Sequence, residues 1–309
     1  MTSTTNLLST VKLPTSKQEQ VLASKPLFSE WEEQLINRSI KFAFEEDLGI
    51  KEEDITSLAT VSPDAVVSAS LVLKQKGTVA GLYLLEKVFG KLDPSISIKL
   101  FNQDGDAIEQ IPHTIATITG KARAVLAGER LALNYIQRLS GIATKTKKFV
   151  ELAKPEGIQI LNTRKTTPGL RTLEREATYV AGALNHRFGL SEGILIKDNH
   201  IRLAGGIPQA IAKVREMYPD RIAEVETTTL HEVRQAELAG AEIVMLDNMT
   251  PHMVAEAVAI LDGKAFIEVS GGITLENISR YLIKGVNGIS IGGLTHSAPA
   301  IDISLEVKI

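Results

Sequence analysis

The sequence contains no cysteine. Disulfides, thiol nucleophiles and cysteine-based zinc sites are therefore excluded, and the composition fits a reducing compartment such as the cytoplasm. No apolar run approaches the roughly 18 residues of a membrane span, so we expect no membrane partner. The formal net charge is only −3, so no overall basic field points to nucleic acid. A local cluster of cations is then expected to serve a small anion.

The start of the chain is unlike the rest. Residues 1–26 are rich in Ser and Thr and contain a single acidic residue, Glu19. This composition predicts a flexible tail. It is also close to that of an organelle transit peptide, but such peptides are rich in Arg and this segment has none. Organelle targeting is therefore the minor alternative.

The next section mixes helices with strands. A helix is predicted from about Phe28, because Ser29 and Glu32 have the spacing of a capping box. Its apolar residues recur at helical spacing, at Trp31, Leu35, Ile36, Ile40 and Phe44. Strands are predicted at Val66–Lys74, Thr78–Leu82, Ser95–Phe101 and Thr114–Arg123, before a long helix at Val125–Val150. We interpret this section as an α+β domain of about 100 residues.

The organisation changes from about Gln159, where short apolar strands alternate with amphipathic helices. The predicted strands are Ile158–Leu161, Gly193–Ile196, Ile222–Val225, Ile243–Leu246, Ala265–Val269 and Gly288–Ile291. This alternation is typical of parallel βα units. Because a complete TIM barrel has about eight such units, we predict an incomplete α/β barrel. An open doubly wound sheet is the alternative.

Polar and glycine residues stand just after each predicted strand. They are Thr163, Arg164 and Lys165, Lys197, Glu226, Asp247, Ser270, Gly271 and Gly272, and Gly292 and Gly293. His186 and Arg187 follow the helix that comes after the first of these strands. Because the carboxyl ends of barrel strands converge on one mouth, these residues are predicted to share one site.

The predicted site has a cationic, an acidic and a glycine part. Its cations, Arg164, Lys165, His186, Arg187 and Lys197, suit a multiply charged acid or a pyrophosphate. The paired glycines precede predicted helix starts and let backbone N–H groups approach a phosphate closely. Glu226 and Asp247 can accept hydrogen bonds from ribose, hold Mg²⁺ or stabilise a cationic transition state.

Each of these features also has a simpler interpretation. An Arg-Lys pair is often a solvated turn, paired glycines are often just a turn, and a strand-end acid often caps the next helix. Lys197 at a strand end could also form a Schiff base. Four other histidines are interpreted as structural. His113, His231 and His252 show no metal-ligand spacing, and His296 stands near the second pair of glycines.

Long runs of the sequence resemble the quinolinate phosphoribosyltransferase family. The matching runs are Gly128–Asn134, Gln137–Thr144, Thr163–Arg171, Asn185–Arg187, Leu195–His200, Ser270–Ile273 and Ser290–Ser297. The resemblance covers the chain from about Phe28 onward. The sequence departs from the family pattern at Ala181–Leu184, where glycines are common, and more mildly at Glu192 and Gly293.

The resemblance implies an N-terminal α/β sandwich domain packed on a partly open α/β barrel. The implied boundaries are a tail at 1–26, a sandwich at 27–138 joined by 299–309, and a barrel at 139–298. The implied reaction converts quinolinate and phosphoribosyl pyrophosphate to nicotinate mononucleotide, pyrophosphate and CO₂, with Mg²⁺, in NAD biosynthesis. A homodimer, or a larger hexamer, is also implied, with Arg130 reaching into the neighbouring subunit's site.

The resemblance also implies roles for single residues. Arg164, His186, Arg187 and Lys197 would bind the carboxylates of quinolinate, with Thr163 beside them, and Lys165 would serve both the acid and the phosphate ligands as a catalytic residue. Glu226 and Asp247 would act on the ribose and hold its Mg²⁺, largely through substrate and water. Ser270, Gly271, Gly272, Gly292 and Gly293 would take the 5′-phosphate.

Other functions remain open at this stage. A paralogue of the same fold, of the kind associated with molybdenum transport operons, would act on another anion and need not keep the complete set of cations. An aldolase-like barrel would use Lys197 covalently. A binding module would have been expected to lose Glu226 or Asp247, and both are present.

Overall fold

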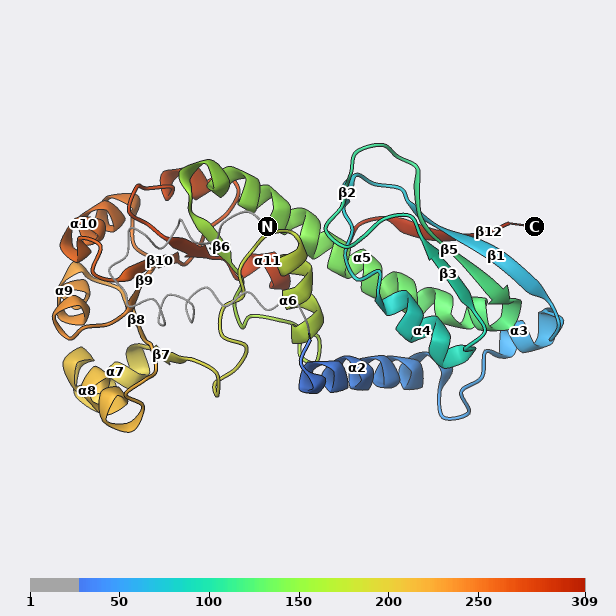
Figure 1. Ribbon diagram of the computed structural model, residues 1–309, viewed down its shortest axis with the longest axis horizontal. Helices are drawn as coiled ribbons and strands as arrows, with labels where there is room; N and C mark the ends of the chain where they lie inside the picture. The colour runs from blue at the N-terminus through green and yellow to red at the C-terminus, as the bar shows by residue number, and fades with distance from the viewer. Residues whose placement is uncertain (1–27, 309) are drawn as a thin grey trace. The chain divides into compact units, whose positions relative to one another are not determined.

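The computed structural model describes residues 28–308, and the tail expected at residues 1–26 lies outside them. The described chain forms two compact units (Figure 1). One, the barrel unit, consists of Lys148–Lys165 and Ala183–Gly293. The other, the sheet unit, consists of residues 28–147, Thr166–Gly182 and residues 294–308. Within residues 28–308, no helix is long and apolar enough to cross a membrane.

The sheet unit begins with helix α2 (Glu30–Leu48), and its predicted capping box is confirmed. The backbone N–H of Ser29 donates to Glu32 Oε2 at 2.8 Å, and the N–H of Glu32 donates to Ser29 Oγ at 3.3 Å. Ile36, Ile40 and Phe44 are buried as the helical spacing predicts. Trp31 is 54% exposed and does not belong to this buried stripe, because nine residues before Ile40 is the opposite side of an α-helix.

An antiparallel four-stranded sheet is the centre of the sheet unit. Its strand order is β12-β1-β5-β3, and the strands are β1 (Val66–Leu73), β3 (Ser97–Leu100), β5 (His113–Lys121) and β12 (Ile303–Lys308). The last strand pairs with the first, with Leu73 opposite Ile303 and Ser68 opposite Lys308. The C-terminal segment is thereby part of the same sheet as β1.

The region between β1 and β3 differs from the prediction. Instead of a strand at Thr78–Leu82, the chain forms a two-residue strand β2 (Gly77–Thr78) paired with β4 (Ala107–Ile108), followed by helix α4 (Leu84–Leu92). Gly81 has a φ of 89°, which turns the chain out of the extended direction before the helix. Val79, Ala80 and Leu82 are all buried, and so short an apolar run does not show which conformation it takes. Helix α4 itself buries Leu84, Leu85, Val88 and Phe89 at helical spacing, a signal that the prediction did not use.

Helices α5 (Ala122–Ala153, whose last turns belong to the barrel unit) and α6 (Arg171–Val180) pack in one hydrophobic core with the elements above. The short helix α3 (Ile55–Thr60) buries Ser57 alone of its residues. Buried side chains of α2, α4, α5 and α6 meet β1 and β5 in this core. Helix α6 therefore belongs with the sheet by its packing, although it follows the first barrel strand in sequence.

The barrel unit contains a parallel six-stranded sheet with the order β6-β11-β10-β9-β8-β7. Its strands are β6 (Gln159–Leu161), β7 (Ile194–Ile196), β8 (Ala223–Thr227), β9 (Ile243–Asp247), β10 (Phe266–Ser270) and β11 (Gly288–Ser290). β6 and β7 lie at its two edges, so the prediction of an incomplete barrel is confirmed. A short bridge from Leu184 to Leu161 extends the sheet at the β6 edge.

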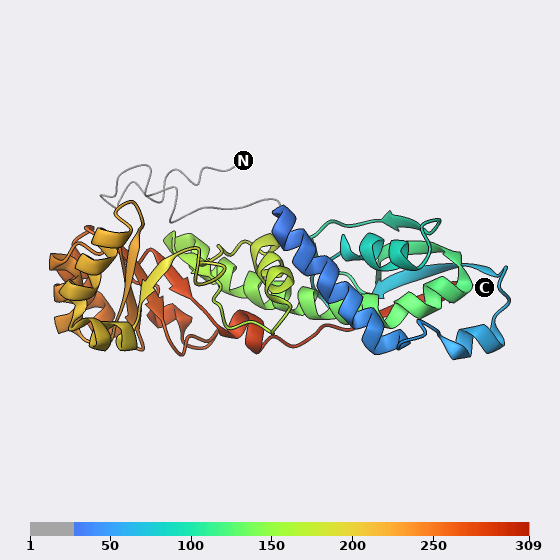
Figure 2. The same cartoon turned by 90° about the horizontal axis from the view of Figure 1, so that it is seen from below.

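Helices cover the outer face of this sheet, as Figures 1 and 2 both show. They are α7 (Asp198–Ala204), α8 (Ile207–Met217), α9 (Leu230–Leu238) and α10 (Pro251–Leu261). The connection between β10 and β11 contains a 3-10 turn, η4 (Ile278–Arg280), in the place of an α-helix. The four-residue helix α11 (Gly293–His296) follows β11. A second 3-10 turn, η3 (Lys154–Glu156), precedes β6.

Candidate active site

The register of the parallel strands places the predicted site residues in aligned rows. Leu161, Ser290, Ser270 and Asp247 are successive partners across β6, β11, β10 and β9. Aligned neighbours in a sheet point their side chains to the same face. Ser270 and Asp247 therefore lie on one face at the carboxyl ends of their strands, as predicted.

Lys197 and Glu226 lie next to each other on the same side of the sheet. Lys197 follows Ile196, which is paired with Val225, and its ammonium donates to Glu226 Oε2. The side chains are 42% and 14% exposed. The pair therefore lies at the edge of the site, where each charge is partly accessible to a ligand.

Asp247 supplies the second accessible carboxylate. It ends β9 and is half-buried, and its Oδ2 accepts a hydrogen bond from Asn248 Nδ2 at 2.8 Å. Asn248 has a φ of 55°, in the left-handed region that Asn tolerates better than most residues. The site thus holds two oxygen-donor side chains, Glu226 and Asp247, on the neighbouring strands β8 and β9.

The first glycine turn, Ser270–Gly272, lies directly against Asn248. Gly271 has a φ of 96°, and a Cβ at this position would lie 2.3 Å from Asn248 Oδ1. Only glycine fits there without moving the neighbouring strand end. The prediction of a helix start after this turn is wrong, because a turn at Thr274–Asn277 and η4 follow instead.

The second glycine turn, Gly292–Gly293, follows β11, and α11 begins at Gly293 itself. The N–H of Ile291 donates to the carbonyl of Leu161 at 3.0 Å, which keeps this segment beside the end of β6. Here the predicted helix start is confirmed, although the helix has a single turn.

The basic loop, Asn162–Arg171, is tied to the segment that carries His186. Asn162 is fully buried; its Nδ2 donates to Asn185 Oδ1 at 2.5 Å, and its Oδ1 accepts from the N–H of His186 at 3.1 Å. Arg164 and Lys165 follow, and the N–H of Lys165 donates to Thr163 Oγ1 at 3.1 Å. The structure therefore brings the two predicted cationic segments together.

Arg164 and Arg187 are close enough to act on each other's charge. Burial lowers the pKa of Arg187, and the neighbouring Arg164 lowers it further. Arg187 Nη1 donates to the carbonyl of Gly193 at 2.8 Å, which fixes its position, while its Nε is buried without a hydrogen-bond partner in the described part of the chain. Two guanidinium groups that act on each other's charge favour an anion near both.

His186 points into the barrel rather than away from it. Its Nδ1 accepts from the N–H of Arg187 at 2.8 Å, and its Nε2 lies 3.2 Å from Glu224 Oε1 and 3.7 Å from Glu268 Oε1. Burial opposes a charged ring, but the two carboxylates outweigh it and raise the pKa of His186 to about 9. The imidazolium forms only when the Arg187 N–H moves off Nδ1, since a protonated Nδ1 cannot accept a hydrogen bond. In either state Nε2 carries a proton.

Glu224 and Glu268 were not among the predicted site residues. Both are buried, and burial together with the charge of Glu224 raises the pKa of Glu268 to about 7. With His186 they bring three ligand atoms within 4.8 Å of one another. The proton on His186 Nε2 argues against a metal there. Their signal in the sequence was an acid inside each of two apolar strands, which is rare unless it has a partner.

Arg130 lies in the sheet unit, on α5, with an exposed side chain. Of the histidines interpreted as structural, His113 Nε2 is 2.9 Å from Asn102 Oδ1, and the exposed His252 is paired with Glu256 at 2.6 Å. His231 and His296 are exposed.

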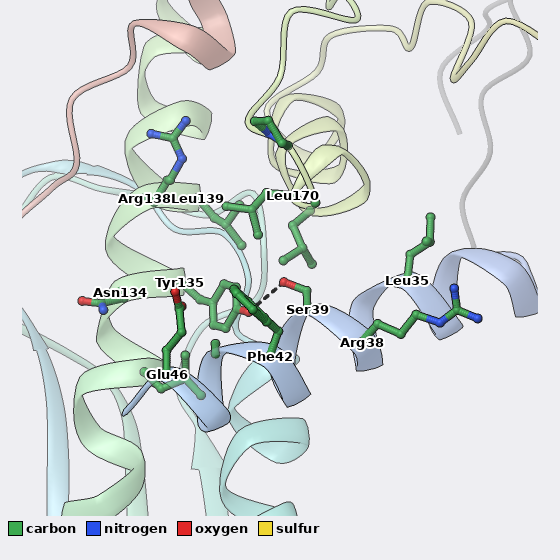
Figure 3. Close-up of a pocket in the computed structure, with 15 residues that line it drawn as sticks. Leu35, Arg38, Ser39, Phe42, Glu46, Asn134, Tyr135, Arg138, Leu139 and Leu170 are labelled. Carbon is green, nitrogen blue, oxygen red and sulfur yellow. Dashed lines mark hydrogen bonds between the residues drawn. The ribbon is translucent and has the colours of Figure 1, made fainter. Parts of the chain in front are cut away.

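The sheet unit also has a hollow of about 610 Å³ between α2, α5 and the loop before α6 (Figure 3). Its walls are mostly apolar, with Phe42 and Tyr135 facing each other and Arg38 and Glu46 at the margin. Ser39 Oγ and Tyr135 Oη are hydrogen-bonded at 2.9 Å across it. None of the predicted site residues lines the hollow.

Comparisons with known proteins were made for the whole chain. The family model "Quinolinate phosphoribosyl transferase, N-terminal domain" matches residues 54–140, and "Quinolinate phosphoribosyl transferase, C-terminal domain" matches residues 142–306. The probable nicotinate-nucleotide pyrophosphorylase [carboxylating] of Bacillus subtilis is 41% identical over 89% of this chain and 94% of its own. The chloroplastic nicotinate-nucleotide pyrophosphorylase [carboxylating] of Arabidopsis thaliana is 39% identical over 87% of this chain and 81% of its own.

Solved structures agree with these matches. The crystal structure of NadC from Streptococcus pyogenes superposes with a TM-score of 0.85 and 36% identity, over 92% of this chain and 99% of the other. The nicotinate-nucleotide pyrophosphorylase from Francisella tularensis superposes with a TM-score of 0.84 and 37% identity, over 89% and 96% of the two chains.

Proposed function

Because this chain belongs to the quinolinate phosphoribosyl transferase family, we propose that it acts as a carboxylating nicotinate-nucleotide pyrophosphorylase. It is a pentosyltransferase of NAD biosynthesis and converts quinolinate and phosphoribosyl pyrophosphate to nicotinate mononucleotide, pyrophosphate and CO₂. The observation that carries the proposal is the pair of hydrogen bonds from Asn162 to Asn185 and His186, which sets the segment of Arg164 beside the segment of Arg187. A planar dicarboxylate is the ligand that these two guanidinium groups match.

Quinolinate is positioned by the cations of the site. Arg164 and Arg187 supply planar forks for its carboxylates, Lys197 and Lys165 add point charges, and Thr163 lies beside them. His186 contributes by holding the N–H of Arg187, and it reaches a carboxylate itself only if its ring turns. Binding in one orientation supplies much of the rate, because it turns a bimolecular step into a local one.

Ribosyl transfer needs negative charge near the anomeric carbon. The ring nitrogen of quinolinate forms a bond to that carbon, and the bond to pyrophosphate breaks with its electron pair leaving on the pyrophosphate oxygen. The carbon is cationic in the transition state, and Glu226 and Asp247 stabilise it. Lys165 serves the leaving pyrophosphate.

Decarboxylation follows from the product of the first step. Once the ring nitrogen is cationic, the carboxylate beside it leaves as CO₂. The electron pair of the broken bond stays on the ring carbon, which then takes a proton. The chemistry calls for no protein nucleophile, so Lys197 acts as a cation and not as a Schiff base.

The two glycine turns bind the phosphate of the ribosyl group. Ser270, Gly271, Gly272, Gly292 and Gly293 present backbone N–H groups and a hydroxyl without bulky side chains. The positive φ of Gly271 and Gly272 supports this role, because such turns point successive N–H groups toward one anion.

Mg²⁺ fits the donors of this site. Glu226 and Asp247 offer hard oxygen ligands, and Mg²⁺ in phosphate chemistry commonly takes only one or two carboxylates and completes its shell with water and substrate. When bound, the ion neutralises pyrophosphate charge. The ion pair with Lys197 holds the Glu226 carboxylate in place at the end of β8.

The working assembly in this proposal is a homodimer, with a hexamer of such dimers as a further step. Arg130 is exposed on α5, on the same helix as Leu131 and Tyr135 of the hollow in Figure 3. Phe42, 62% exposed at that hollow, adds apolar surface of the kind that subunit contacts cover. In the dimer Arg130 completes the quinolinate site of the other subunit. Residence in the cytoplasm is proposed from the absence of cysteine.

The test is an assay of the purified protein with quinolinate, phosphoribosyl pyrophosphate and Mg²⁺, following nicotinate mononucleotide and CO₂. A parallel reaction replaces quinolinate with nicotinate, which lacks the second carboxylate. Turnover with quinolinate alone supports the proposal. Turnover with nicotinate would contradict the assignment of the cations, and no turnover with either acid would contradict the activity.

A further inference from the structure

Arg138 joins three separate segments of the sheet unit. From α5, its Nε and Nη2 donate to Glu174 Oε1 of α6 at 2.9 and 2.5 Å. The same Nη2 donates to Thr167 Oγ1 at 3.0 Å and to the carbonyl of Thr295 at 3.1 Å. Arg138 also lines one end of the hollow in Figure 3, where its guanidinium points away from Tyr135 and Ser39. One side chain thus binds the basic loop, α6 and the segment after the second glycine turn.

Glu174 is the buried centre of this network. Its side chain has no exposed surface, and both oxygens are used. Oε1 accepts from Arg138 and from Thr167 Oγ at 2.7 Å, and Oε2 accepts from the N–H of Thr167 at 3.0 Å. Helix α6 has no side-chain N-cap at Leu170, so Glu174 holds the backbone that enters the helix. Buried ion pairs seldom add stability beyond an apolar pair, which suggests that geometry is what this pair provides.

Arg138 holds the end of the basic loop at Thr167 and the segment after the second glycine turn at Thr295. Leu161 of β6 and Ser290 of β11 are paired in the barrel sheet. Arg164 and Lys165 lie between Leu161 and Thr167, and the second glycine turn lies between Ser290 and Thr295. Each loop is therefore fixed at one end by a strand and at the other by the Arg138–Glu174 pair.

The segment after Thr295 lies firmly along α5. Lys145 Nζ donates to the carbonyl of Ser297 at 3.0 Å. A Cβ on Gly141 would lie 2.0 Å from the carbonyl oxygen of Pro299, so the segment approaches the helix as closely as a backbone can. The carbonyl of Thr295 is therefore presented to Arg138 from a rigid backbone.

We propose that Arg138 and Glu174 are positioning residues that set the places of the basic loop and the second glycine turn together, and so control binding of both substrates through one ion pair. The proposal rests on the proposed function, in which the first loop takes quinolinate and the second takes the phosphate. Neither residue touches a substrate.

The test variant is Arg138→Lys. Lysine keeps the charge but has one donor group in place of the planar fork, so it cannot serve Glu174, Thr167 and Thr295 together. We expect the KM values for quinolinate and for phosphoribosyl pyrophosphate both to rise, by about 10-fold or more, because small misplacements of binding groups are costly. The kcat at saturation is expected to change less. Glu174→Gln should raise the same two KM values.

The matched control is Arg215→Lys. Arg215 Nη2 donates to Glu242 Oε2 at 2.5 Å and to the carbonyl of Gly240 at 3.1 Å, and Glu242 accepts from the N–H of Ala223 at 2.9 Å. The side chains of this pair are 30% and 8% exposed, against 32% and 0% for Arg138 and Glu174. It lies at the amino end of β8, away from the predicted site residues of the barrel. Arg215→Lys should lower the melting temperature to a similar degree and leave both KM values unchanged.

Hydrogen exchange separates this proposal from the proposed function. Amides of residues 163–171 and 291–297 should exchange faster in Arg138→Lys, and not in Arg215→Lys, whatever the protein turns over. Unchanged exchange in both segments, unchanged KM values, or a rise in only one KM would overturn the proposal. Absence of turnover in the wild-type protein, with the exchange difference present, would instead contradict the proposed function.

Discussion

Lys197 and Glu226 form an ion pair at the carboxyl ends of β7 and β8. The lysine side chain is 42% exposed, so its ammonium lies at the edge of the site. Because the ammonium donates to the Glu226 carboxylate, its surroundings are those of an anion-binding cation and not of a free amine nucleophile. The same contact positions the Glu226 carboxylate, so one interaction supports both the acid-binding and the ribose-binding halves of the proposed site.

Lys197→Met should lower kcat/KM for quinolinate by about 10- to 100-fold, the range expected for losing a hydrogen bond to a charged group. Glu226 would then face the substrate dianion unpaired. The control is Lys264→Met, because Lys264 pairs with Glu237 at 2.6 Å with exposures of 57% and 8%. Steady-state kinetics checks both variants. Equal losses of kcat/KM in the two variants would contradict the assignment of Lys197 to the quinolinate site.

Asp247→Asn should lower kcat by about 100-fold or more, as removal of a transition-state charge stabiliser commonly does. The KM for quinolinate should change little, since Asp247 is assigned to the ribose side. Asp262→Asn serves as the control, because Asp262 is exposed and left-handed, with a φ of 43°, which Asn tolerates. A kcat for Asp247→Asn within a few-fold of wild type would contradict the role given to this carboxylate.

Gly271→Ala should raise the KM for phosphoribosyl pyrophosphate and lower the melting temperature. Gly205→Ala is a close control, since both glycines have a φ of 96° and a Cβ on Gly205 meets nothing within 4 Å. Both variants pay the left-handed strain of about 1–2 kcal/mol, but only Gly271→Ala collides with Asn248. If the two variants change the KM and the melting temperature equally, the close approach of Gly271 to Asn248 does not contribute to phosphate binding.

Glu176→Gln should stabilise the protein at high pH only. Burial raises the pKa of Glu176 to about 7, and Asp104 and Glu32 add repulsion. The folded state therefore holds a proton that the unfolded state loses near its ordinary pKa of 4.5, and stability falls as pH rises from 4.5 to 7. Discounted for partial exposure, the gain at pH 8.5 is about 1–2 kcal/mol.

Denaturant unfolding at pH 4.5 and pH 8.5 checks the prediction for Glu176. The exposed Glu86→Gln on α4 is the control and should show no difference between the two pH values. A gain for Glu176→Gln that is the same at both pH values would show that ionisation of Glu176 is not its cause.

Chelation with EDTA should abolish turnover without unfolding the protein. The proposed Mg²⁺ is held by Glu226, Asp247, water and substrate, and none of these contacts belongs to a hydrophobic core. Removing the ion should therefore leave the stability of the folded protein unchanged. Turnover should return with added Mg²⁺, while the melting temperature stays constant throughout. A fall in melting temperature on chelation would indicate a structural metal instead.

The sequence by itself determined the barrel and the contents of its mouth. Alternating strands and helices from Gln159 onward have clear periods, and the polar residues after each strand were found where parallel strands must place them. Ser29 and Glu32 similarly predicted the start of α2, since a capping box is a contact between residues three apart. Such features depend on local geometry, which a single stretch of chain contains.

Only the tertiary structure decided the contacts between distant segments. The strand predicted at Thr78–Leu82 did not form, because Val79, Ala80 and Leu82 belong to an apolar run too short to show a period. Helix α6 joins the sheet unit, and Glu174 there meets Arg138, because their packing depends on a core assembled from the whole unit. The burial of Glu224 and Glu268 around His186 likewise required three strand and loop segments to come together. Partners so far apart in sequence leave no local pattern, since their interaction energy exists only once the fold has formed.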